Sequence, residues 1–155
     1  MDLKQEFVEA VSEHFRQLTR AFDAELASVA QMSYPRATKF LLFEYDSPTF
    51  GEEFSVFLSA MDANGEPIGD GYQFLQGKAV TVPAELYEAD KYEEIDPWAT
   101  ASELLESWLI ERWSNVAGTR KAYPAFVGHH DSYFKTNLMT GQQINWDEIL
   151  GNVGS

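Results

Sequence analysis

The histidines near the C-terminal end, with the aspartate beside them, come closest to a catalytic or metal-binding cluster. His129, His130 and Asp131 are consecutive, and on a strand neighbouring side chains point to opposite faces. His129 and Asp131 are then the pair that can share a site, while His14 lies on the exposed side of a predicted helix. A metal would need acids from elsewhere in the chain. We therefore predict ordinary hydrogen bonds in a turn, with no metal and no cofactor.

A second group of polar residues, three acids and one asparagine, has a spacing similar to that of a calcium-binding loop. It consists of Asp62, Asn64, Glu66 and Asp70. A calcium loop needs a glycine at its sixth place and a glutamate at its end, whereas here the glycine is fourth and the final glutamate is missing. Because Asn-Gly sequences tolerate the positive φ of tight turns, we predict a hairpin turn at this place.

The sequence contains none of the common catalytic motifs. It has no cysteine, which excludes thiol catalysis and iron–sulfur or zinc-ribbon sites. It also has no GxSxG, P-loop, GxGxxG or HExxH sequence. Because 25 acidic residues make chance carboxylate pairs inevitable, such pairs point to no particular reaction. The sequence therefore predicts a protein that is not an enzyme.

Two amphipathic helices are predicted to position any site. Apolar residues recur every three or four positions over residues 3–29, which is the stripe of a helix with one buried face. A second helix is predicted to begin at Asp96 and Pro97, since aspartate accepts hydrogen bonds from free amides and proline suits the first helical position. Its Trp-rich stripe runs over residues 98–116, and Gly118 ends it.

Short strands account for most of the remaining chain. Strands are predicted at residues 39–45, 53–61, 72–76, 125–129, 133–138 and 142–145, followed by a helical turn at 146–150. Gly69 and Gly71 are expected to bracket the third strand, and residues 83–94 are either a helical turn or an acidic loop. The predicted fold is α+β: one domain over residues 1–155, with an antiparallel β-sheet of about five or six strands packed with both helices.

The negative charge is concentrated in the middle of the chain. Residues 41–111 hold 16 acids and 2 bases, which equals the net charge of −14 of the whole chain. The densest windows interleave acids with tyrosines, and we call them the acidic-aromatic surface. Its predicted partner-binding residues are Glu85, Tyr87, Glu88, Asp90, Tyr92, Glu93, Glu94 and Asp96, together with Glu44, Asp46, Glu52 and Glu53. The two groups form either two acidic surfaces or one joined surface.

This charge excludes some partners and favours others. A chain of net charge −14 is repelled by phosphates, so we expect no nucleic acid and no anionic membrane as partner. Acids interrupt the first fifteen residues, where a signal peptide needs an apolar run, and we expect a cytoplasmic location. The charge serves either general solubility or the attraction of a basic partner to tyrosine anchors.

The order of elements carries one resemblance to a known group. An N-terminal helix, an acidic meander, a Trp-rich second helix and a closing strand pair with HHDSYFKTNLMTGQQINWDEI resemble the small cytoplasmic immunity proteins of bacterial toxin systems. The resemblance implies a stoichiometric inhibitor that binds a cognate toxin, often a basic nuclease, and blocks its active site or substrate groove.

Two other interpretations remain open. One is a small-molecule-binding or enzymatic domain whose cavity lies between sheet and helices, lined by Trp108, Phe57 and Tyr72. The other is an acidic adaptor or chaperone for a basic protein.

Overall fold

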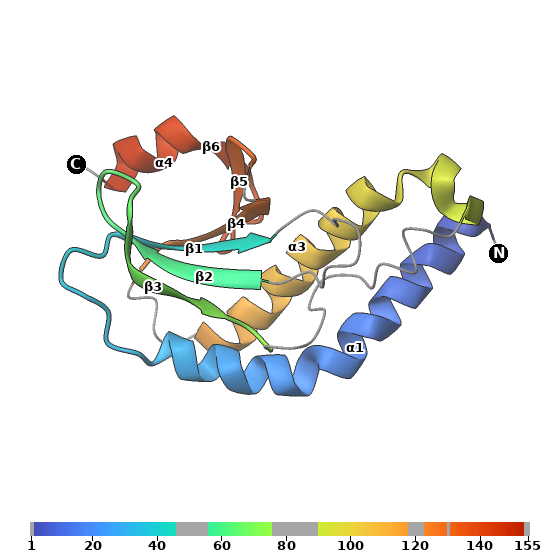
Figure 1. The fold of residues 1–155 in the computed structure, drawn as a ribbon, viewed down its shortest axis with the longest axis horizontal. Helices are drawn as coiled ribbons and strands as arrows, with labels where there is room; N and C mark the ends of the chain where they lie inside the picture. Colours follow the sequence, from blue (N-terminus) through green and yellow to red (C-terminus); the bar gives the residue numbers. More distant parts are fainter. Residues whose placement is uncertain (1, 46–55, 76–89, 118–122, 130, 154–155) are drawn as a thin grey trace.

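The computed structural model describes residues 2–45, 56–75, 90–117, 123–129 and 131–153 (Figure 1). In chain order the elements are α1 (Leu3–Ala30), β1 (Phe40–Tyr45), β2 (Val56–Met61), β3 (Pro67–Gln73), the 3-10 helix η1 (Asp90–Ile95), α3 (Pro97–Ala117), β4 (Ala125–His129), β5 (Phe134–Asn137), β6 (Gln143–Asn145) and α4 (Trp146–Val153). The predicted α+β fold and both long helices are confirmed. Among the described residues, no helix is long and apolar enough to cross a membrane.

The six strands form one sheet in the order β3-β2-β1-β4-β5-β6. Neighbouring strands are antiparallel, as predicted, except for the central pair: β1 and β4 run parallel, with Leu41 opposite Ala125 and Tyr45 opposite His129. The sheet is therefore mixed, although mostly antiparallel. The helix α3 lies between β1 and β4 in the chain, and it returns the backbone to the end of the sheet at which β1 begins. β4 therefore starts at the same end as β1, and the two strands pair in parallel.

Both faces of β1 are covered, as its continuous apolar run predicts. Leu41, Phe43 and Tyr45 belong to the core beneath α1 and α3, whereas Phe40 and Leu42 belong to a smaller core beneath α4. Figure 1 shows α1 and α3 on one side of the sheet and the short α4 on the other. Because α4 has only eight residues, it covers only part of the sheet face that carries Phe40 and Leu42. The rest of that face has room for a binding site.

The two long helices lie side by side and run in the same direction. Phe15 and Phe22 of α1 contact Trp108 of α3, with ring centroids 4.8 and 4.6 Å apart. Further along both helices, Asp23 pairs with Arg112 at 3.0 Å. The side chain of Asp2 caps α1 in a capping box, and Asp96 accepts a 3.3 Å hydrogen bond from the amide of Ala99 at the predicted start of α3.

The β2–β3 hairpin confirms one turn prediction and corrects another. The Asp62 side chain accepts hydrogen bonds from the amides of Asn64 and Glu66 at 2.8 and 3.0 Å, which closes the predicted turn. Gly69 and Gly71 lie within β3 and do not bracket it, and the strand ends at Gln73. β3 is an edge strand that meets β2 at an irregular register, so it accommodates the positive φ of 72° at Gly69.

Candidate functional site

The structure places part of the acidic-aromatic surface. The prediction also includes residues that lie outside the described part of the chain, namely Glu85, Tyr87, Glu88, Asp46, Glu52 and Glu53. Asp90 begins η1, but its side chain is outside the described set. The predicted residues whose side chains are placed are Tyr92, Glu93, Glu94, Asp96 and Glu44.

η1 presents the exposed part of this surface. It packs against α1 and α3, and Glu93, Glu94 and Asp96 are exposed on it or next to it. Lys91, the basic residue of the segment, is engaged elsewhere: its Nζ donates to Glu6 at 2.5 Å. The hydrogen bond from Lys91 lowers the pKa of Glu6. The charges of Glu93 and Glu94 therefore face water.

Tyr92 is a core residue, and the prediction that its ring is open to a partner is wrong. Its exposed fraction is 3%, and its ring meets Phe7 edge to face at 5.1 Å. The hydroxyl reaches the surface of α1 and donates to Glu6 Oε1 at 3.0 Å. Burial of the ring with a satisfied hydroxyl suits tyrosine, because its body is apolar and its tip is polar. A repeated acid-aromatic pattern does not distinguish this arrangement from an exposed one.

Glu44 lies on the opposite face of the sheet from η1. Its strand neighbours Leu42 and Phe40 point toward α4, and alternation places Glu44 on that same face. Its carboxylate is 3.5 Å from Nζ of Lys135. The described acids therefore belong to two separate surfaces, which is one of the two arrangements that the sequence left open.

Lys135 is the functional candidate that sequence reasoning missed. It sits on β5 with an exposed side-chain fraction of 3%, and Nζ donates to the carbonyl of His129 at 2.8 Å. Gly128 of β4 lies between Lys135 and Glu44, and a Cβ there would be 2.6 Å from Lys135 Cδ. The absence of a side chain at Gly128 lets the lysine cross β4 and reach Glu44 on β1. The available signal was a lone basic residue in the middle of a predicted strand.

A basin of about 500 Å³ opens above this ion pair, and we call it the sheet basin. Its floor is formed by the central strands, and its walls by the β2–β3 hairpin, the β4–β5 turn and the start of α4. The lining residues are Leu42, Glu44, Ser59, Met61, Gly65, Pro67, Asp131, Ser132, Tyr133, Lys135 and Trp146. This volume lies within the usual range of ligand sites.

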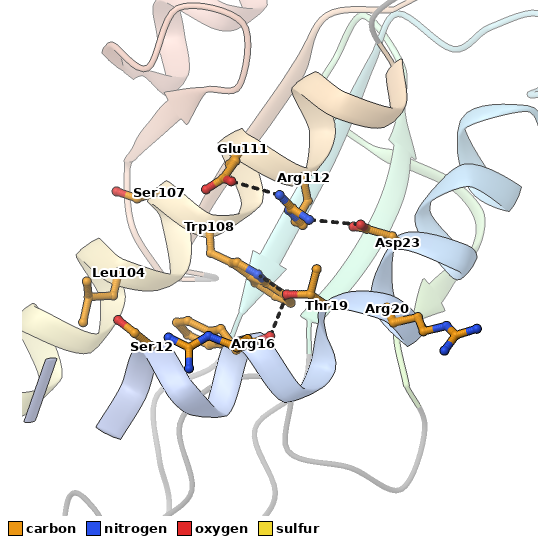
Figure 2. A pocket seen from close by; sticks show the side chains of 11 residues that line it. Ser12, Arg16, Thr19, Arg20, Asp23, Leu104, Ser107, Trp108, Glu111 and Arg112 are labelled. Atoms are coloured by element: carbon orange, nitrogen blue, oxygen red, sulfur yellow. Dashed lines mark hydrogen bonds and ion pairs between the residues drawn. The ribbon is translucent and has the colours of Figure 1, made fainter. Parts of the chain in front are cut away.

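A second hollow, a groove of about 730 Å³, lies between α1 and α3 (Figure 2). Trp108 lines it and donates from Nε1 to Thr19 Oγ1 at 3.1 Å. At one end Arg112 donates to both Asp23 and Glu111, at 3.0 and 2.9 Å, and at the other Arg16 pairs with Glu13. Most of the charges at the groove are thus neutralised by contacts that hold or flank the two helices.

The cavity predicted between sheet and helices is not formed by its three proposed residues. Trp108 lines the groove between the helices, and Tyr72 uses its hydroxyl to donate to Glu25 Oε1 at 2.6 Å. Phe57 is 37% exposed and alternates with Leu58, which is in the core, so it points to the other face of the sheet. A ligand-binding interpretation would instead rest on the sheet basin.

Of the histidine cluster, His129 ends β4 and Asp131 lies in the turn before β5. The amide of Asp131 donates to His129 Nδ1 at 3.1 Å, and the ring of His129 meets Tyr45 edge to face. His130 lies outside the described residues. Within the described ranges, three or more potential metal ligands do not come together anywhere.

No protein-family model, curated protein or solved structure matches this chain.

Proposed function

We propose that the protein binds a basic protein and neutralises it, as immunity proteins of bacterial toxin systems do. The observation that supports the proposal is the exposed charge of η1. Glu93 and Glu94 face water and make no ion pair within the described part of the chain, while Lys91 of the same 3-10 helix pairs with Glu6 of α1. They belong to a segment, residues 41–111, with 16 acids and 2 bases.

Such a surface acts first on the rate of encounter. Summed charges of one sign attract an oppositely charged partner over distances longer than a contact, and this accelerates association by roughly 10- to 1,000-fold at low salt. Contact area must then come from apolar groups. Leu3 is 40% exposed in the first turn of α1, the helix against which η1 packs, and Tyr87 remains a predicted contact.

Charge reversal on η1 tests the proposal. The variant E93K/E94K changes the net charge by +4 and should slow association with the basic partner about tenfold at low salt. The difference should shrink at high salt, because the screening length falls from about 10 Å at 0.1 M to about 3 Å at 1 M. The partner is the protein recovered with the wild-type chain from its native host, and association is followed by stopped-flow or surface binding kinetics.

A matched control separates the surface from the total charge. Glu66 and Asp70 are exposed on the β2–β3 hairpin, and the variant E66K/D70K also changes the charge by +4. We expect this control to slow association much less than E93K/E94K. Equal slowing by both variants would show that net charge alone attracts the partner, and the η1 surface would lose its assigned role.

A functional assay separates the inhibitor from an adaptor or chaperone. An inhibitor should abolish the activity of the partner at a one-to-one ratio, whereas a chaperone should leave the folded partner active. Retained activity in the saturated complex would therefore move the assignment to the adaptor class.

A further inference from the structure

Burial of the Lys135–Glu44 ion pair beneath the sheet basin costs desolvation free energy. Lys135 is almost wholly removed from water, and the desolvation of a buried cation often exceeds the attraction that it gains. Apolar residues at both positions would be expected to serve the fold as well or better. Buried charges in a cleft are therefore candidates for a functional site, and here the pair lies at the floor of a cavity.

The charges that line the basin favour a cation. Glu44 and Asp131 contribute two negative charges and Lys135 one positive charge, and the remaining lining residues are uncharged. Lys135 directs its ammonium to the carbonyl of His129 and to one oxygen of Glu44. The second oxygen, Oε1, accepts no hydrogen bond from the described residues, and the Glu44 side chain is 30% exposed. The negative field of the whole chain acts in the same direction.

Two aromatic side chains line the wall beside these acids. Tyr133 is 48% exposed, and its hydroxyl donates to Asp147 at 2.6 Å, which fixes the ring. The amide of Trp146 donates to the carbonyl of Tyr133 at 2.9 Å, so the two residues are held side by side. Trp146 is also supported from the hairpin, where Gly65 approaches its indole closely. Aromatic faces attract guanidinium groups, which suit carboxylates as well.

We propose that the sheet basin receives an arginine side chain of the basic partner. The guanidinium donates to Glu44 and Asp131, and its flat face lies against Tyr133 or Trp146. Lys135 is a positioning residue that holds the Glu44 carboxylate in place across Gly128. This inference rests on the proposed function, because it names the chemical group that the same kind of partner inserts on the sheet face opposite η1.

The site can be probed without the partner. The wild-type chain is titrated with N-acetyl-arginine amide, and the indole signals of Trp146 are followed by NMR after assignment with Trp146→Phe. N-acetyl-citrulline amide has nearly the same shape without the charge and serves as the matched ligand. We expect the arginine amide to bind with a dissociation constant on the order of millimolar, and the citrulline amide at least about fivefold more weakly.

Two variants of the protein test the assigned acids. Glu44→Gln keeps the shape and an oxygen for Lys135, and it should weaken arginine-amide binding about five- to tenfold. Asp131→Asn, at an exposed position, should weaken it in the same direction and keeps the test valid if Glu44→Gln is unstable. Glu94→Gln makes the same charge change on η1, and it should leave this binding unchanged. Equal binding of citrulline, unchanged binding in both basin variants, or preferential binding of acetate would overturn the proposal.

The partner itself separates the two proposals. If E93K/E94K slows association and Glu44→Gln leaves the dissociation rate unchanged, the basin fails and the acidic η1 surface stands. If Glu44→Gln accelerates dissociation and E93K/E94K associates as fast as the wild-type chain, the basin stands and the η1 surface fails.

Discussion

Replacing Gly128 by alanine should disrupt the buried ion pair, because the Lys135 side chain crosses β4 over this glycine. Gly128 lies in β4, and its φ is not in the left-handed region, so alanine suits the backbone. The added Cβ would lie 2.6 Å from Lys135 Cδ and 3.2 Å from the carbonyl oxygen of Phe134. Ordinary carbon contacts are about 3.5–4.0 Å. The lysine chain must therefore move by about 1 Å or more in a place where it is 3% exposed.

The magnitude follows from two costs. Overpacking of a tight site typically costs about 1–3 kcal/mol. Moving the chain also weakens the hydrogen bond from Lys135 Nζ to His129, and bonds to charged groups contribute about 1.5–3 kcal/mol. Because the second loss is partial, we expect the free energy of unfolding to fall by about 2–4 kcal/mol. For a domain of this length, that lowers the melting temperature by about 5–15 °C.

A double-mutant cycle with Lys135→Ala identifies the cause. Urea denaturation of wild type, both single variants and the double variant gives the coupling energy between Gly128 and Lys135. Once the lysine is shortened, alanine at position 128 should cost less than about 1 kcal/mol, so the coupling should exceed about 1 kcal/mol. Equal costs of Gly128→Ala in both backgrounds would refute the clash with Lys135, as would a loss below about 0.5 kcal/mol in the wild-type chain.

Two further predictions concern the helical face of the sheet. Leu105→Ala or Phe15→Ala should cost about 2–5 kcal/mol in urea denaturation, because both side chains are buried in the main core; losses under about half a kcal/mol at both positions would contradict this packing. The hydrogen bond to Glu25 raises the pKa of Tyr72 from 10.0 to about 12. Since the folded pKa exceeds the unfolded one, this stabilisation is complete below pH 10 and is lost as the pH rises through 12. Phenolate absorbance measures the titration, and Tyr72→Phe should remove that component; a Tyr72 that ionises near pH 10 in the folded chain would contradict it.

The periodicity of the sequence predicted the helices and strands better than it predicted which strands pair in the sheet. The stripe over residues 3–29 and the Asp96-Pro97 start correspond to α1 and α3, because amphipathic spacing and capping are local properties. Strand alternation shows which residues share a face, yet it contains no information on which strand lies beside β1. The parallel β1–β4 pairing therefore required the structure.

The candidate site was less predictable than the fold for a physical reason. The ion pair beneath the sheet basin joins Glu44 of β1 to Lys135 of β5 across Gly128 of β4, and Glu44 is distant in the chain from the other two residues. A carboxylate, a glycine and a lysine have no shared motif at such separations. Tyr92 illustrates the converse case, since its place beside acids indicated a surface, whereas its ring is held against Phe7.

The parallel pair at the centre of the sheet has a consequence for synthesis of the chain. β1 ends at Tyr45 and β4 begins at Ala125, so roughly 80 residues must be made before the second side of β1 acquires its partner. Until then one edge of a strongly apolar strand has unpaired backbone groups, and such edges favour pairing with other chains. Closing so long a loop also slows folding relative to local contacts. A ribosome-bound chain that ends before β4 should therefore depend on chaperones far more than the finished domain does.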